Sequence, residues 1–164
     1  MSGTPVQWQI ALEVAARLAI ISTGSGYWHQ IDTVDIGRAD PFEAEEVPCA
    51  LVSIGADTLI DERSSTERRE LSIQIRAGVE RGEISPALTA SRLGTDVAIA
   101  INRSTTDPAV SDTPSHRLGG IVSGLRVESI AQDIGDAQAA YIGAIVELVV
   151  TYQVARGDPF TLIP

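Results

Sequence analysis

The chain has 164 residues, a formal net charge of −10 at pH 7 and a sequence pI of about 4.5. This charge argues against binding to nucleic acid or to an anionic membrane surface, because both require clustered Lys and Arg. A hydrophobic content of 44% excludes a disordered chain, and an aromatic content of only 4% predicts an aliphatic core, in a single domain over residues 1–164.

The first predicted element is an amphipathic helix over residues 6–21. Thr4 and Pro5 supply a cap and a first helical position, and Gln7 can reach back to the cap amide. Apolar residues recur at helical spacing, and glycines follow the helix and end it. The helix is too short and too charged to span a bilayer, and no signal peptide precedes it. We therefore expect synthesis in the cytoplasm and no membrane contact.

Three strands are predicted next. Residues 28–36 alternate between polar and apolar, residues 49–54 form a short buried run, and residues 71–79 give the cleanest half-buried alternation. The acidic segment 42–47 is interpreted as a solvated loop, and the polar segment 57–66 as a loop or hairpin end.

A second helix starts at Ser85 and Pro86, where the cap-then-proline signal recurs, and its apolar spacing continues to residue 101. Residues 104–116 form a polar linker, and residues 123–130 are predicted as another strand. A turn then leads into the final strand.

The final strand, residues 139–154, is the longest predicted element. Every second residue from Ile142 is apolar, whereas the alternate set is mixed, so one face is buried and the other partly wet. Sixteen residues would span about 50 Å, roughly three times an ordinary strand. Residues 156–164 form an irregular tail. The order of elements predicts an α+β fold: a mostly antiparallel sheet of about five strands with two main helices packed on one face.

Candidates for chemistry are few. His29 and His116 have no second His or Cys at metal-ligand spacing, so surface or partner-facing roles are favoured. The lone Cys49 is interpreted as a small buried residue, which fits a reducing compartment. Two acidic groups lack the spacing of a calcium loop and are interpreted as solvated faces: Glu43, Glu45 and Glu46, and Asp57, Asp61 and Glu62. We predict no catalytic, metal or cofactor site.

What remains points to assembly. The final strand is longer than two helices can cover, and its mixed face needs a packing partner. The segment 62–70 carries charges of both signs, which suits a polar docking surface, although a plain solvated hairpin explains it equally well. The candidate interface residues are Arg63, Glu67, Arg68, Arg69, Tyr141, Ile145, Glu147 and Val149.

Four segments, in this order, resemble the tail terminator proteins of long-tailed bacteriophages, also called minor tail or tail completion proteins. They are the helix ending in Gly26-Tyr27 with the Thr33-Val34 strand after it, the strand after Pro48 (residues 49–54), the helical run 93–101, and the closing run 150–160. Together they cover most of the chain.

The resemblance implies a virion protein, assembled in the host bacterial cytoplasm, that forms a ring, usually hexameric, at the head-proximal end of the tail tube. Such a ring stops tube polymerisation and offers a surface to the head connector and neck proteins. Six subunits would carry 6 × −10 = −60 charges, and an acidic lumen lets DNA pass without binding. Two alternatives stay open: another neck or head-completion adaptor, and a small cytoplasmic enzyme with a carboxylate site.

Overall fold

The computed structural model describes residues 3–103 and 114–163. Its helices and strands are α1 (Val6–Leu18), β1 (Thr33–Ile36), β2 (Cys49–Glu62), β3 (Thr66–Glu80), α2 (Pro86–Ile101), β4 (Gly124–Asp133) and β5 (Tyr141–Ala155). Short 3-10 helices lie at Thr23–Ser25, Ala44–Glu46 and Pro114–Gly120. Most of the predicted linker 104–116, with the His116 side chain, lies outside the described residues.

In the described residues the strands form one five-stranded sheet in the order β1-β2-β3-β5-β4. Every pairing is antiparallel except that of β1 with β2, which is parallel. The predicted α+β class with a mostly antiparallel sheet is therefore confirmed. The parallel pair was not foreseen: the connection between β1 and β2 returns the chain to the start of β2 instead of making a hairpin.

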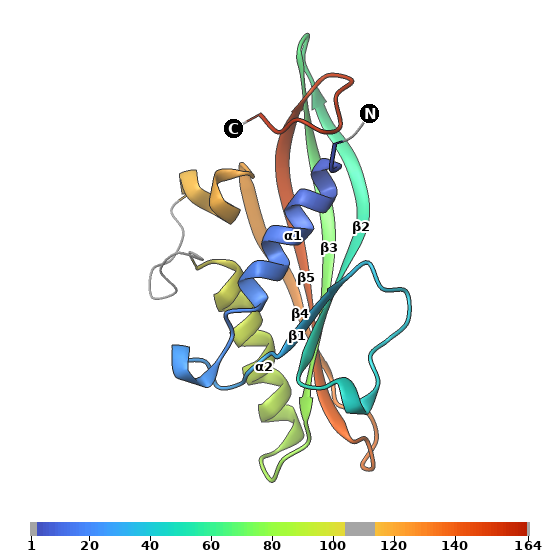
Figure 1. Cartoon of the computed structure of the whole chain (residues 1–164), viewed down its shortest axis with the longest axis vertical. Helices are drawn as coiled ribbons and strands as arrows, with labels where there is room; N and C mark the ends of the chain where they lie inside the picture. Colours follow the sequence, from blue (N-terminus) through green and yellow to red (C-terminus); the bar gives the residue numbers. More distant parts are fainter. Residues whose placement is uncertain (1–2, 104–113, 164) are drawn as a thin grey trace.

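Both helices lie on the same face of the sheet (Figure 1). The core forms where their buried stripes meet the inward side chains of β2, β3 and β5. α2 lies close to the sheet at Gly94, where a Cβ would be 2.4 Å from Ile130 and 3.6 Å from Ala144. The predicted arrangement of helices is thus confirmed.

The final strand is as long as its alternation predicts. β5 pairs with β3 along its whole length, from Tyr141 opposite Glu80 to Ala155 opposite Thr66. It pairs with β4 on the other side. The middle position of the sheet, however, belongs to β3, which has the same length of 15 residues as β5.

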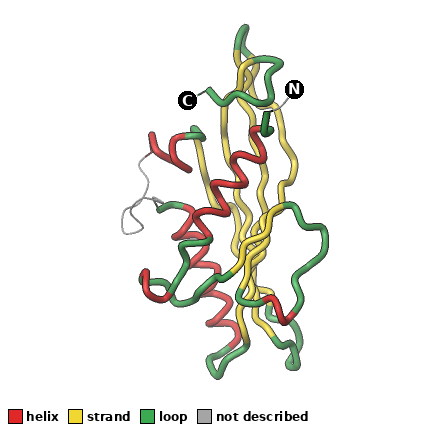
Figure 2. The backbone as a smooth tube through the Cα atoms, viewed as in Figure 1, coloured by secondary structure: helices red, strands yellow, loops and turns green. Residues whose placement is uncertain are grey.

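Of the two structures predicted for residues 57–66, the hairpin end is correct and the loop is wrong. β2 continues to Glu62 and β3 already begins at Thr66, so these residues form the upper part of one long hairpin that extends beyond the helices (Figure 2). The burial pattern explains the error, because this part of β2 is exposed on both faces and shows no alternation. Two register shifts, between Ile54 and Asp57 and between Leu59 and Asp61, interrupt the hairpin.

Segment 42–47 is not a plain solvated loop. Phe42 is only 7% exposed, and its ring centroid lies 5.0 Å from that of Tyr141, on the sheet face opposite the helices. The ring fits because residue 78 is glycine: a Cβ there would be 2.5 Å from the Phe42 ring. The connection between β1 and β2 therefore covers the lower part of this outer face.

The first predicted strand begins later than expected, at Thr33 instead of residue 28. The backbone N–H groups of Trp28 and His29 donate to the buried carboxylate of Asp96 on α2, at 3.3 and 3.0 Å, and so cannot pair in the sheet. His29 Nδ1 is 2.9 Å from the same carboxylate. The predicted surface role of His29 is wrong, since it helps to anchor this loop to α2.

The start of α1 also differs from its prediction. Pro5 is the N-cap and no side chain caps the helix, while the Gln7 amide turns towards β2. The helix ends at Leu18, three residues early, although Ile21 stays buried. The irregular tail runs beside the helix start, where the Val6 N–H donates to the Pro159 carbonyl at 3.0 Å. No helix in the described parts is long and apolar enough to cross a membrane.

Candidate interaction surfaces

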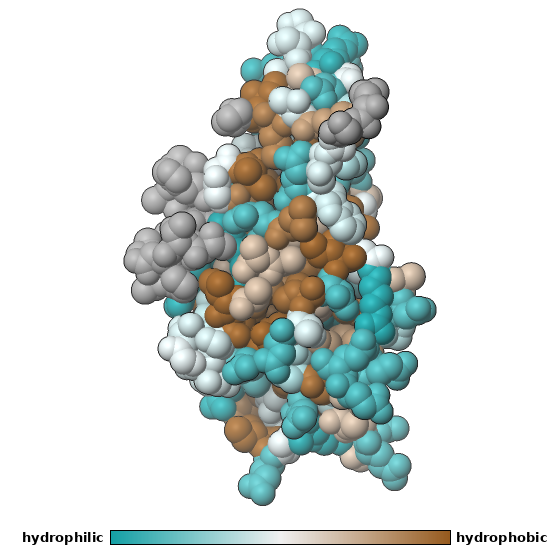
Figure 3. All heavy atoms as spheres, in the orientation of Figure 1, coloured by the Kyte–Doolittle hydropathy of each residue, from teal (hydrophilic) through white to brown (hydrophobic). Residues whose placement is uncertain are grey.

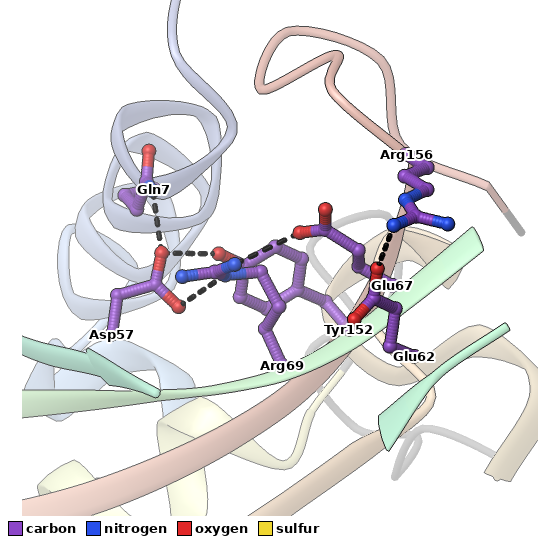
Figure 4. Close-up of polar contacts among 7 residues, drawn as sticks. All are labelled: Gln7, Asp57, Glu62, Glu67, Arg69, Tyr152 and Arg156. Atoms are coloured by element: carbon purple, nitrogen blue, oxygen red, sulfur yellow. Dashed lines mark hydrogen bonds and ion pairs between the residues drawn. The ribbon is translucent and has the colours of Figure 1, made fainter. Parts of the chain in front are cut away.

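A polar cluster lies where the long hairpin leaves the helix layer (Figure 4). The Asp57 carboxylate accepts hydrogen bonds from Gln7 Nε2 at 2.6 Å, from the Tyr152 hydroxyl at 2.7 Å and from Arg69 Nε at 3.0 Å. Arg69 also donates to Glu67 at 2.9 Å. The cluster therefore joins α1, β2, β3 and β5 through a single carboxylate.

Burial sets the electrostatics of this cluster. Tyr152 is 1% exposed, and its pKa is raised above the usual value. The larger cause is burial, and the second is the hydrogen bond to Asp57. Its hydroxyl therefore stays protonated at physiological pH and acts as a donor. The Arg69 side chain, 26% exposed, is held between two carboxylates, so the charges largely compensate within the cluster.

A half-open cavity of about 230 Å³ adjoins the cluster. Its walls come from the start of α1, the hairpin and the tail, and include Val6, Val154 and Pro159 beside the polar groups. Each polar side chain of the cluster already has a partner within the chain. This arrangement suits fixing the direction of the hairpin better than it suits acid–base chemistry.

The structure divides the predicted docking residues of the hairpin. Glu67 and Arg69 belong to the internal cluster and are largely used there. Arg68 points to the opposite face, because successive strand residues alternate. Arg63 at the tip is 80% exposed and lies 3.4 Å from Asp61. Only Arg63 and Arg68 therefore remain available for a partner.

The hairpin also exposes apolar side chains. Leu59 is 44% exposed and Ile60 48% exposed, next to the second register shift. The upper hairpin thus presents two large aliphatic groups together with charges of both signs, a mixture found in protein–protein contacts. The prediction of a solvated acidic face at residues 57, 61 and 62 is correct for Asp61 and wrong for Asp57, whose side chain is 16% exposed.

The mixed face of β5 is only partly available. Tyr141 packs against Phe42, and Val149 is 8% exposed. Ile145 is partly buried, and Glu147 is exposed, with Gln74 donating to it at 3.3 Å. Of the four predicted interface residues on this strand, Glu147 is thus exposed, Tyr141 and Ile145 are partly buried, and Val149 is buried.

An ion pair explains the burial of Val149. Arg126 on β4 is 3.1 Å from Glu70 on β3, and β5 lies between these two strands. Arg126 is the cross-strand neighbour of Val149, and Glu70 that of Thr151. The pair therefore crosses β5 above these two residues and covers them without any partner molecule.

The outer edge of the sheet is open at β4, which pairs only with β5 within the described residues. Ile130 on this strand is 45% exposed. It borders a groove of about 370 Å³ beside α2, whose lining includes Ala98 and Ile99. One register shift, between Val127 and Ser129, interrupts the strand.

The described residues contain no group of three or more His, Cys, Asp or Glu side chains arranged to hold a metal ion. In the predicted acidic group of Glu43, Glu45 and Glu46, the Glu46 carboxylate is paired with Arg38 and also accepts the Glu43 N–H. These contacts lower the pKa of Glu46, first of all the hydrogen bond from Arg38. Glu43 and Glu45 are exposed, as predicted.

Sequence reasoning missed Gln7 and Tyr152 as members of the hairpin cluster. Tyr152 falls on the wholly apolar face of β5, and a tyrosine there needs a partner for its hydroxyl. That requirement was the available signal for a buried acceptor nearby. Comparison with models of known protein families gives no match, and comparison with curated proteins gives no significant match.

Proposed function

We propose that this protein is a structural subunit that caps the head-proximal end of a bacteriophage tail tube. In this role it assembles with copies of itself into a ring, hexameric as in the family that it resembles, stops tube growth and offers a surface for head-tail joining. Its partners are the tail tube protein and the head connector or neck proteins, and DNA passes through the ring without specific binding.

The observation that carries the proposal is the long β2–β3 hairpin. It extends beyond the helix layer (Figure 1), is fixed at its base by the Asp57 cluster, and exposes Leu59, Ile60 and Arg63. A rigid projection with an exposed mixed tip suits docking onto a neighbouring subunit or a tube end. The net charge of −10 agrees with a lumen that repels DNA phosphates.

The test is the growth of tubes from purified tail tube protein with and without this protein. Light scattering follows the rate, and electron micrographs give the length distribution. We expect shorter tubes, with added density at one end, at substoichiometric amounts of the protein. Tube lengths that do not respond at any ratio would contradict the proposal.

A matched pair of variants makes the test specific. Arg63→Glu reverses the charge at the tip of the hairpin, and we expect it to weaken capping at least tenfold. Arg92→Glu makes the same charge change on α2, far from the hairpin tip, and should cap as the unmodified protein does. Equal effects of both variants would point to net charge instead of hairpin docking.

The same samples distinguish a tube-capping protein from the alternative, a neck or head-completion adaptor. A neck or head-completion adaptor would bind purified heads and increase head-tail joining, yet leave tube length unchanged. That result would replace the proposed function by the adaptor role.

A further inference from the structure

The two faces of the upper hairpin, residues 57–70, carry different charge. On the helix side, the described lining of the 230 Å³ cavity contains three carboxylates and one guanidinium, those of Asp57, Glu67, Asp158 and Arg69. Arg69 is shared by Asp57 and Glu67 (Figure 4), so these lining residues leave no cation for Asp158. The cavity therefore has an excess of negative charge.

Asp158 has a fixed position at this cavity. The Phe160 N–H donates to its Oδ1 atom at 2.9 Å, and the tail turns just before it at Gly157, whose φ of 74° is left-handed. Hydrogen bonds from Phe160 and then Thr161, and not a cation, lower the pKa of Asp158. Its carboxylate is therefore charged and held in place, while its partners in the described chain are neutral groups.

The outer face of the same hairpin carries the opposite charge. A small hollow of about 50 Å³ on this face is lined by Arg63, Arg68 and one carboxylate, that of Asp61. Asp61 lies 3.4 Å from Arg63. Arg68 is exposed and forms no ion pair with any residue that the structure describes. In a chain with a net charge of −10, this is a local excess of positive charge.

The positive face suits the negative cavity in chemistry as well as in charge. The cavity combines the Asp158 carboxylate with apolar walls from Val6, Val154 and Pro159. Figure 3 shows hydrophilic and hydrophobic side chains next to one another at this upper end of the molecule. An arginine side chain has an aliphatic stem that packs on apolar walls and a guanidinium that pairs with a carboxylate.

A second copy of the chain is the partner that this pattern fits. Arg68 and Asp158 lie on opposite faces of the hairpin, so they meet only when the hairpin of another copy is stacked on the first. The other charges of an acidic chain repel an identical chain, and this complementary pair of faces determines where two copies can approach.

We infer that the hairpins of neighbouring copies stack face to face, with Arg68 of one copy in the cavity of the next copy, where its guanidinium pairs with Asp158. The contact joins two different surfaces and is therefore head-to-tail: each copy offers Arg68 to one neighbour and Asp158 to the other. Contacts of this kind close into rings or continue as open filaments. The inference rests on the proposed function in one respect, because a tube cap requires the closed form.

Sedimentation of the full chain over a concentration series is the first test. We expect a multiple of the 17.4 kDa chain mass that stops rising at high concentration. Arg68→Asp should weaken association at least tenfold. Asp158→Asn removes the charge, keeps an acceptor for the Phe160 N–H, and should weaken association as well. Arg76→Asp is the matched control, since Arg76 is an exposed arginine on the same face of β3 but outside both hollows, and this variant should associate normally.

Exchanging the two charges tests the pairing itself. Arg68→Asp and Asp158→Arg should each fail to associate alone. The chain with both substitutions should associate again, and so should an equimolar mixture of the two single variants, because each variant supplies the charge that the other lacks. Recovery on mixing also shows that the single variants are folded, since mixing does not restore an unfolded chain.

Disulfide formation tests the direction of the contact. On mild oxidation, a mixture of Arg68→Cys and Asp158→Cys chains should form mixed disulfide dimers, whereas neither variant should crosslink to itself. The native Cys49 is 3% exposed and serves as the unreactive background.

Four results would overturn the inference: a single-chain mass at every concentration, association that Arg68→Asp leaves unchanged, a charge-exchanged chain that stays single, and Arg68→Cys chains that crosslink to each other. Tubes that Arg68→Asp shortens as well as the unmodified protein would refute this contact and leave the proposed capping intact. Association that the charge exchange restores, without any effect of the protein on tube length, would support the contact and refute only the proposed function.

Discussion

Replacing Asp57 tests how the base of the hairpin is held. Asp57→Ala removes the acceptor of the Tyr152 hydroxyl, on a side chain only 1% exposed, and an unpaired buried donor costs about 1–3 kcal/mol. Arg69 keeps its ion pair with Glu67 at 2.9 Å and is 26% exposed, so losing the Arg69–Asp57 ion pair costs about 1 kcal/mol or less. The expected destabilisation is about 3 kcal/mol, or a Tm lower by about 10 °C.

Asp57→Asn separates the charge from the hydrogen bonds. The amide oxygen can take the place of Oδ2 and still accept from Tyr152 and Gln7, while the amide nitrogen faces Arg69 and loses that contact. The expected loss is therefore only about 1 kcal/mol.

Urea denaturation measures the free energy of unfolding of both variants. An unchanged m-value indicates that the substitutions have not altered the folded or the unfolded state. Adding Tyr152→Phe to Asp57→Ala removes the stranded hydroxyl and should restore at least about 1 kcal/mol. Equal losses for Asp57→Asn and Asp57→Ala, or no recovery in the double variant, would refute the reasoning that a buried tyrosine donor sets the cost.

Three further predictions follow from other contacts. Burial raises the pKa of the Cys49 thiol to about 11 from its ordinary 9.0, so the unfolded chain loses this proton first as pH rises. The free energy of unfolding should therefore fall by about 1 kcal/mol between pH 9 and 10, and Cys49→Ala should flatten that slope in denaturant titrations. Gly78→Ala should cost about 1–3 kcal/mol, because its Cβ would lie 2.5 Å from the Phe42 ring, and Phe42→Leu in the same chain should recover part of it in thermal melts. Asp96→Ala should cost about 3 kcal/mol and speed hydrogen exchange of the His29 N–H; unchanged exchange would mean that this carboxylate does not hold the loop.

The sequence predicts those parts of the fold in which one face is buried. The alternation from Ile142 identifies β5, and the spacing through residues 86–101 identifies α2, because each element meets the core on one side only. The upper hairpin has no such pattern, since residues such as Thr58 and Leu59 are exposed on both faces. There the strand is held by backbone pairing with β3, which leaves no periodic signal in the side chains.

The hairpin cluster and the His29 loop were unpredictable for a different reason. Each depends on one carboxylate, Asp57 or Asp96, meeting donors from segments far apart in the chain. Local spacing carries no information on such meetings. Of the candidate interface residues, Arg63 and Arg68 on the hairpin and Glu147 on β5 are exposed, and their part in an interface stays a prediction.

The register shifts lie on two open borders of the sheet, which are the part of β2 beyond its pairing with β1, a pairing that ends at Val52, and the edge strand β4. On β2 they fall at Ile54/Asp57 and Leu59/Asp61, and on β4 at Val127/Ser129. An incoming foreign strand can match the backbone donors and acceptors of either border for only a few residues before the spacing fails. Many subunits can then accumulate at one site in a cell without forming fibres by edge-to-edge strand pairing. Side-chain contacts therefore determine which subunits associate.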